Sequence, residues 1–139
     1  MNRKTRRARQ RERRHENANP ATETALVKVG AKHMLLSEAL GLGVDLMNEG
    51  HRAKAAEIFA CILDSAPGQP DALHLMGMLH FQEGRLDEAA RLVRQAVKRD
   101  PRNEFAWCNL GAVLRAAGDN AGAIVATRRF SICLHISPY

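Results

Sequence analysis

Apolar and small residues recur at the spacing of an α-helix over two neighbouring segments in the middle of the chain. In residues 70–82, one helix face collects Leu73, Met76, Gly77, His80 and Phe81. In residues 86–98, the corresponding face collects Leu86, Ala89, Ala90, Val93, Ala96 and Val97. Gly84 lies between the segments, where glycine suits the left-handed residue that ends a helix, and Pro101 stops the second segment. The pattern predicts two helices joined by a tight turn.

The same pattern occurs three times with a period of 34 residues. Small residues recur in register in the sets Gly43, Gly77 and Gly111, then Gly50, Gly84 and Gly118, then Ala55, Ala89 and Ala123. One such helix pair cannot bury its apolar faces alone, so its stability must come from stacking on its neighbours. We therefore predict an all-α helical solenoid of about three helix-turn-helix repeats, at residues 36–69, 70–103 and 104–139. In the first repeat, the helices are expected at residues 36–48 and 53–65.

The end of the third repeat departs from this register. In the second repeat, Pro101 follows Ala89 by 12 residues, whereas in the third repeat Pro138 follows Ala123 by 15. An insertion of three residues would lengthen the last helix by almost one turn and keep its apolar side inward. A divergent end of the chain would produce the same mismatch, and the sequence leaves both explanations open.

Residues 23–35, which precede the first repeat, have a helix-like pattern. Thr22 or Thr24 can cap a helix, and apolar positions then follow at Ala25, Leu26, Val29 and Leu36. We expect an additional N-terminal helix or an extension of the first repeat helix.

Residues 1–22 form a basic tail with almost no apolar side chain to bury, so we expect them to be disordered or to form a frayed, solvated helix. The basic residues are Arg3, Lys4, Arg6, Arg7, Arg9, Arg11, Arg13 and Arg14. Glu12 and Glu16 offset two of them, and the resulting excess equals the net charge of +6 of the whole chain. The tail is either simply solvated or binds nucleic acid, the ribosome or another anionic surface through salt-sensitive contacts. It has no aromatic residue on which bases would stack.

No motif for catalysis, a cofactor or a metal is present, so the sequence predicts a protein that is not an enzyme unless it is a fragment of one. Glycine-rich phosphate loops, nucleophile elbows and His-Glu-x-x-His are all missing. His74 and His80 are six residues apart, which does not suit ligands on one helix face. Cys61, Cys108 and Cys133 have no paired spacing, so we expect reduced thiols and a cytoplasmic location. No apolar run of membrane-spanning length and no secretory signal occurs.

The period and its fixed residues resemble the tetratricopeptide repeat family. The residues that carry the resemblance are Gly43, Gly50, Ala55, Pro67, Gly77, Gly84, Ala89, Pro101, Trp107, Leu110, Gly111, Gly118 and Ala123. The resemblance covers residues 36–138 and implies a right-handed solenoid whose first helices line a concave groove. The positions that point into the groove in this family are here Ser37, Leu40, Val44, Met47, Asp71, His74, Met78, Phe81, Phe105, Cys108, Ala112 and Arg115, with Asn109 beside them.

Two specialised members of the family fit poorly. Repeats that clamp the C-terminal carboxylate of chaperones carry Lys, Asn and Arg where this chain has Leu40, Val44 and Leu75. Repeats of the O-linked N-acetylglucosamine transferase type hold peptide backbone with a ladder of asparagines, of which only Asn109 is present. The phrasing of residues 70–77 and 107–114 nevertheless looks like bacterial proteins that join such repeats to a glycosyltransferase, sulfotransferase or methyltransferase domain.

The leading hypothesis from the sequence is a non-catalytic protein–protein interaction module, or scaffold, that binds a peptide or a partner helix in its groove. A mostly apolar lining that contains Met and Phe suits such ligands. The alternatives are the recruiting N-terminal region of a larger glycosyltransferase- or sulfotransferase-type enzyme and a nucleic-acid adaptor that works through the tail. We also expect self-association at the third repeat, because apolar residues crowd its end at Phe130, Ile132, Cys133, Leu134 and Ile136.

Overall fold

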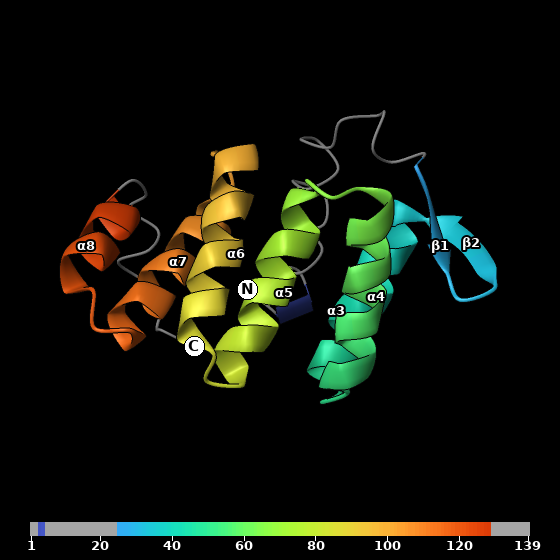
Figure 1. Ribbon diagram of the computed structural model, residues 1–139, viewed down its shortest axis with the longest axis horizontal. Helices are drawn as coiled ribbons and strands as arrows, with labels where there is room; N and C mark the ends of the chain where they lie inside the picture. The colour runs from blue at the N-terminus through green and yellow to red at the C-terminus, as the bar shows by residue number, and fades with distance from the viewer. Residues whose placement is uncertain (1–2, 5–24, 129–139) are drawn as a thin grey trace.

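The computed structural model describes residues 3–4 and 25–128, in which a short β-hairpin precedes six helices. The strands are β1 (Leu26–Val29) and β2 (Lys32–Leu35), and the helices are α3 (Leu36–Asn48), α4 (Arg52–Ser65), α5 (Pro70–Gln82), α6 (Leu86–Arg99), α7 (Glu104–Ala116) and α8 (Asn120–Arg128). The helices lie side by side in chain order, with the hairpin at one end and α8 at the other (Figure 1). The predicted all-α helical repeat solenoid is confirmed, and the helix bounds of the first repeat agree with the prediction within one residue.

Each helix pair turns on a glycine with positive φ. The φ angles are 85° at Gly50, 80° at Gly84 and 87° at Gly118. At the second of these turns, the Arg85 N–H donates to the His80 carbonyl over 2.9 Å, and the Gly84 N–H donates to the Phe81 carbonyl over 3.1 Å. This pair of bonds is the Schellman motif, which satisfies carbonyl groups at the end of a helix. The glycine spacing in the sequence therefore marks the turns because only glycine adopts this backbone conformation without strain.

Small residues let the two helices of a repeat approach closely. A Cβ atom added to Gly77 of α5 would lie 2.7 Å from Val93 Cγ2 and 3.2 Å from the Ala89 carbonyl oxygen, both on α6. Ala89 itself is fully buried. At the equivalent place in the first repeat, a Cβ on Gly43 would collide with the ring of Phe59. The recurring small residues therefore lie at the contacts that set the spacing between helices.

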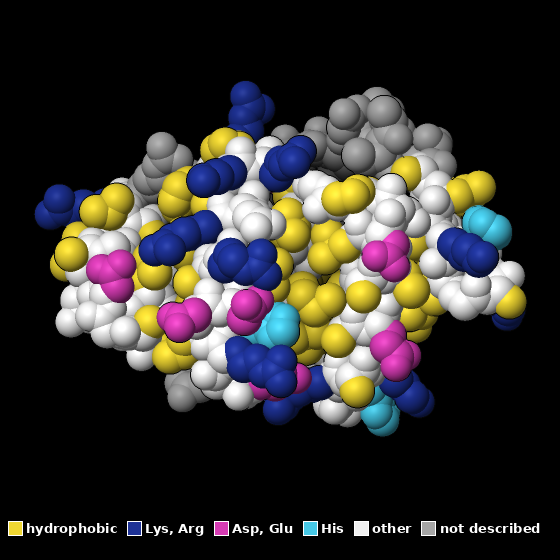
Figure 2. Space-filling model, viewed as in Figure 1, with side chains coloured by type: hydrophobic (Ala, Val, Ile, Leu, Met, Phe, Trp, Pro, Cys, Tyr) yellow, Lys and Arg dark blue, Asp and Glu magenta, His cyan; other side chains and the backbone are white. Residues whose placement is uncertain are grey.

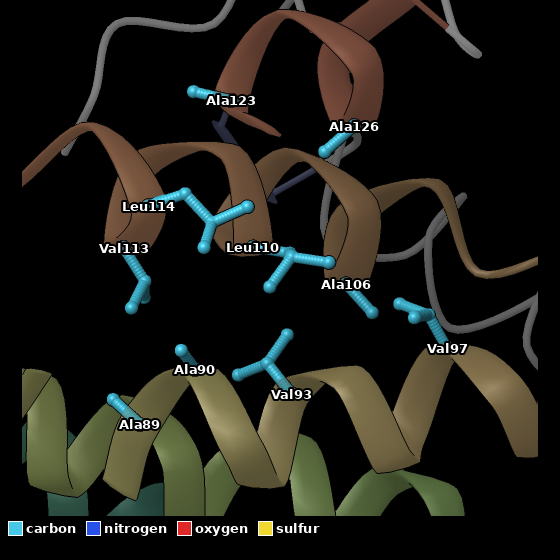
Figure 3. Close-up of a cluster of buried hydrophobic side chains, with 10 residues drawn as sticks. All are labelled: Ala89, Ala90, Val93, Val97, Ala106, Leu110, Val113, Leu114, Ala123 and Ala126. Carbon is cyan, nitrogen blue, oxygen red and sulfur yellow. The ribbon is translucent and has the colours of Figure 1, made fainter. Parts of the chain in front are cut away.

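One core cluster lies between the second and third repeats. It consists of Ala89, Ala90, Val93, Val97, Ala106, Leu110, Val113, Leu114, Ala123 and Ala126. Figure 3 shows the α6 side chains pointing towards α7, which lies between α6 and α8. A second cluster surrounds the fully buried Phe59 and Ile62 of α4. Each cluster draws side chains from neighbouring elements, so the repeats stabilise one another.

The helix predicted within residues 23–35 is wrong, because most of this segment is a β-hairpin. The strands are antiparallel, with Leu26 opposite Leu35 and Val29 opposite Lys32, and Gly30 begins the two-residue turn with a φ of 63°. A positive φ at the first turn position is typical of a type II′ hairpin turn, and it suits glycine. In β1, the side chain of Val27 is 1% exposed.

The hairpin covers the outer end of the first repeat. Val27 packs in the same cluster as Leu36, Ala55 and Phe59, and β1 contacts both α3 and α4. The Leu36 N–H also donates to the Ala25 carbonyl over 2.9 Å, which joins the start of α3 to the residue before β1. End repeats of a solenoid need such a cover for their apolar surface.

Several predictions lie outside the described residues. One is the disorder or frayed helix expected of the tail, of which only Arg3 and Lys4 are described, both helical and exposed. The other is the self-association expected of residues 129–139, including Phe130. The choice between an insertion and a divergent end of the third repeat falls in the same segment.

Candidate functional site

The first helices of the three repeats adjoin one another, because α5 contacts both α3 and α7. Local sequence fixes where two of these helices begin. The Gln69 side-chain oxygen accepts from the Ala72 N–H over 2.8 Å, and the Asn103 side-chain oxygen accepts from the Ala106 N–H over 3.2 Å. Such caps satisfy N–H groups that have no partner within the helix. These two caps therefore fix the first residues of α5 and α7.

A hydrogen bond between side chains joins two of the predicted groove residues across successive repeats. Asn109 Nδ2 of α7 lies 2.7 Å from His74 Nε2 of α5. The amide nitrogen donates, so the ring nitrogen accepts and carries no proton. His74 is 8% exposed, so the bond is shielded from water. The asparagine that the resemblance assigned to peptide backbone thus has its amide nitrogen engaged within the chain.

The apolar residues predicted to line the groove divide their surface between core and solvent. Leu40, Val44 and Met47 of α3 are half-buried, as are Met78 and Phe81 of α5. Met78 and Phe81 pack against the cluster between α6 and α7, and Leu40 and Met47 pack against the cluster around Phe59. Helix packing and a partly accessible surface are therefore both present at these positions.

The groove positions of α7 are more varied. Phe105 is 38% exposed, whereas Ala112 is half-buried and Arg115 is exposed. Asp71, near the start of α5, is half-buried. The predicted groove positions thus include the acidic Asp71, the basic Arg115 and the exposed ring of Phe105 beside the apolar residues.

Cys108 differs from the prediction of reduced thiols, which is wrong at this position. Cys108 is disulfide-bonded, and Cys61 is the free cysteine among the described residues. Disulfide formation depends on the distance and direction of two Cβ atoms in space, which the spacing of cysteines along the chain does not give. The Cys108 sulfur is therefore unavailable as a thiol to a ligand of the groove.

Trp107, a residue of the repeat signature, has a structural role. Its ring Nε1–H donates to the Pro101 carbonyl over 2.9 Å, and its ring packs against the core between α6 and α7. The indole therefore ties the start of α7 to the connection that precedes it. A buried or half-buried tryptophan usually finds such an acceptor for its single donor.

The ion pairs of Arg85 with Glu83 and of Arg91 with Glu88 are exposed. In the second pair, Arg91 Nη2 lies 2.9 Å from Glu88 Oε2, and this hydrogen bond with the guanidinium lowers the pKa of the Glu88 carboxyl. In the described part of the chain, no group of three or more His, Cys, Asp or Glu residues is placed to hold a metal ion. No described helix has the length and apolar character needed to cross a bilayer.

The stacked helix pairs define a helical-repeat solenoid. Residues 70–113 match the family model described as tetratricopeptide repeat, which supports the same repeat type that the sequence pattern indicates. Among solved structures, the crystal structure of MamA matches with 22% sequence identity and a TM-score of 0.62 over 73% of this chain. The match covers 58% of the MamA chain, and at this identity it shows the fold alone. No curated protein sequence matches the chain.

Proposed function

We propose that the chain is a non-catalytic protein–protein interaction module that binds a peptide or a partner helix along its first helices. The observation that carries the proposal is the row of partly accessible apolar side chains on α3, α5 and α7. Its members are Leu40, Val44, Met47, Met78, Phe81 and Phe105. Tetratricopeptide repeats bind protein partners as a class, and the family match over residues 70–113 supports this reading.

The chemistry of the row favours an apolar ligand face. Met47 and Met78 have flexible, polarisable side chains that adapt to different partners, and aromatic rings such as Phe105 supply large contact areas. An amphipathic helix that presents apolar residues at helical spacing meets such a surface well. The His74–Asn109 bond holds α5 and α7 in register and so keeps the surface in one shape before a ligand arrives.

The test compares two large apolar side chains of nearly equal exposure. Phe105 on α7 is 38% exposed and is a groove position, whereas Leu42 on α3 is 40% exposed and lies two residues from Leu40, on a different helix face. A partner would first be captured from native cell extract and identified by mass spectrometry. We expect Phe105→Ser to weaken its binding to the purified chain about tenfold, and Leu42→Ser to leave the Kd within about twofold. Equal Kd values for both variants and the wild type would refute the groove.

We also propose that the chain self-associates through its third repeat. Two large apolar side chains of α8 face solvent, Ile124 at 53% and Val125 at 70% exposed. Exposed apolar residues that cluster on one element commonly mark an association site. A second copy of the chain is the proposed occupant of this face.

A further inference from the structure

The exposed side of α6 carries a row of basic residues. Arg91, Arg94, Lys98 and Arg99 are all exposed, and they follow one another at spacings that keep them on one side of a helix. Figure 2 shows Lys and Arg side chains gathered along α6. From Arg91 to Lys98 the row extends over roughly 10 Å, or two helical turns.

Most of this charge is not neutralised by the chain itself. Glu88 forms an ion pair with Arg91 over 2.9 Å. Arg94, Lys98 and Arg99 form no ion pair within residues 3–4 and 25–128. Asp100 is the one acidic residue between positions 91 and 102. Three cations thus remain for an external anionic partner.

An apolar recess runs beside the basic row. The half-buried Leu63 of α4 and Met76 of α5 pack against the small cluster of Leu73, Leu92 and Ala96. Figure 2 shows hydrophobic side chains gathered in the hollow between α4 and α6. We call this feature the outer groove, with Leu63 and Met76 as its floor and the α6 basic row as its edge.

At one end, the outer groove deepens into a hollow of about 150 Å³, lined by Pro67, Gly68, Leu73, Gln95, Lys98 and Arg99. The Arg99 guanidinium closes over the backbone here, since a Cβ added to Gly68 would lie 2.7 Å from its Cζ. A cavity of about this volume holds one benzene-sized group, whereas sites for drug-sized ligands are at least about twice as large. The hollow is therefore large enough for one side chain of a partner, and its lining combines the apolar Pro67 and Leu73 with the polar Gln95, Lys98 and Arg99.

We propose that the outer groove binds an acidic amphipathic helix of a partner protein, with one apolar side chain in the hollow and its carboxylates along Arg94, Lys98 and Arg99. A nucleic acid would use the charges but not the apolar floor, and no aromatic residue lines the hollow for base stacking. A membrane surface requires apolar residues that project outward, whereas Leu63 and Met76 are half-buried against the cluster of Leu73, Leu92 and Ala96. The basic side chains are spread along two turns of α6, so they can pair with several side-chain carboxylates of a partner, whereas the C-terminus of a partner chain would offer only one carboxylate.

The experiment is a titration of the full chain, followed by fluorescence anisotropy, with a labelled synthetic peptide that is acetylated and amidated. The peptide carries leucine at helical spacing and glutamate at the flanking positions. We expect saturable binding that weakens with added salt, and about a tenfold loss of affinity in Arg94→Glu/Lys98→Glu, which reverses two charges at the groove. Gln95→Trp, which fills the hollow from an exposed position, is expected to weaken binding severalfold.

The matched control is Arg52→Glu/Lys54→Glu, which makes the same charge change at exposed positions at the start of α4, far from the hollow at its end. Both double variants keep the basic tail, so any contribution of the tail to peptide affinity is the same in both and does not affect the difference between them. An equal loss in both double variants would show non-specific attraction and overturn the proposal. Equally tight binding of a peptide with glutamine in place of glutamate would overturn it too. The proposal would also be overturned if the peptide did not bind while poly(U) RNA, or vesicles that contain phosphatidylserine, bound through Arg94 and Lys98.

Discussion

Asn109 donates a hydrogen bond of 2.7 Å to the ring of the buried His74, and the two residues belong to successive repeats. They are 35 residues apart, one more than the period of the repeat. The bond therefore connects positions that are not equivalent in the two copies, and it links α7 to α5 through polar side chains.

We expect Asn109→Ala to lower the free energy of unfolding by about 1–3 kcal/mol, because the shielded His74 Nε2 then lacks this donor. Urea unfolding followed by circular dichroism measures the change. Asn48→Ala, at the exposed end of α3, is the control and should change stability by less than about 0.5 kcal/mol. A double-mutant cycle with His74→Leu should show coupling of about 0.5 kcal/mol or more. Strict additivity would mean that the bond contributes nothing to stability.

Ala89→Leu should destabilise the stack by overpacking. Ala89 has no exposed surface, and its backbone lies against Gly77 of α5, where an added Cβ would be only 3.2 Å from the Ala89 carbonyl oxygen, so a larger side chain has to displace its neighbours. The expected loss is about 1–3 kcal/mol. Ala53→Leu, at an exposed position of α4, provides the comparison. An unchanged thermal midpoint in Ala89→Leu would show that α5 and α6 do not pack through this contact.

Gly84→Ala and Gly41→Ala should change stability in opposite directions. Gly84 has a φ of 80°, which costs an alanine about 1–2 kcal/mol. Gly41 lies within α3, and a Cβ there would meet no atom within 4 Å, so alanine should add about 0.5–1 kcal/mol through its greater helix propensity. Thermal unfolding of both variants checks the prediction. A stabilising Gly84→Ala would contradict the assigned turn.

Val27→Ala should reveal the contribution of the hairpin. The side chain is 1% exposed and packs with Phe59 and Ala55 of α4, so the loss of two methyl groups should cost about 1–2.5 kcal/mol. Lys28→Ala, on the opposite face of the same strand, should be nearly neutral because Lys28 is exposed. If the two variants unfold at the same urea concentration, the hairpin does not cover the first repeat in solution.

Val125→Glu should reduce self-association. Val125 is 70% exposed on α8, and a charge there opposes burial against a second copy. Light scattering over a concentration series should show the wild type increasing in mean mass while Val125→Glu stays at the mass of one chain. Ala117→Glu, at an exposed position just after α7, is the control. A wild type that is monomeric at every concentration would exclude the proposal.

The sequence alone determined the repeat, its period and, to within one residue, the helix bounds of the first two repeats, because these depend on local properties. Gly50, Gly84 and Gly118 mark turns that need positive φ, and alanine or glycine at positions such as Ala89 marks close helix contacts. Apolar spacing in each helix gives the buried face. All of these signals lie within one repeat and recur in the next.

Tertiary structure decided the features that depend on which surfaces meet. Residues 26–35 fit a helix by spacing, but burial of Val27 against α4 and the turn at Gly30 favour the hairpin. The sequence offered His74 and Asn109 as separate groove residues, and only the packing of α5 on α7 brings their side chains together. The residues that follow the tail have a net charge of zero, so the sequence showed no sign of the basic row on α6. A net charge does not record which side chains share a helix face, or which of them form an ion pair with a neighbour, as Arg91 does with Glu88.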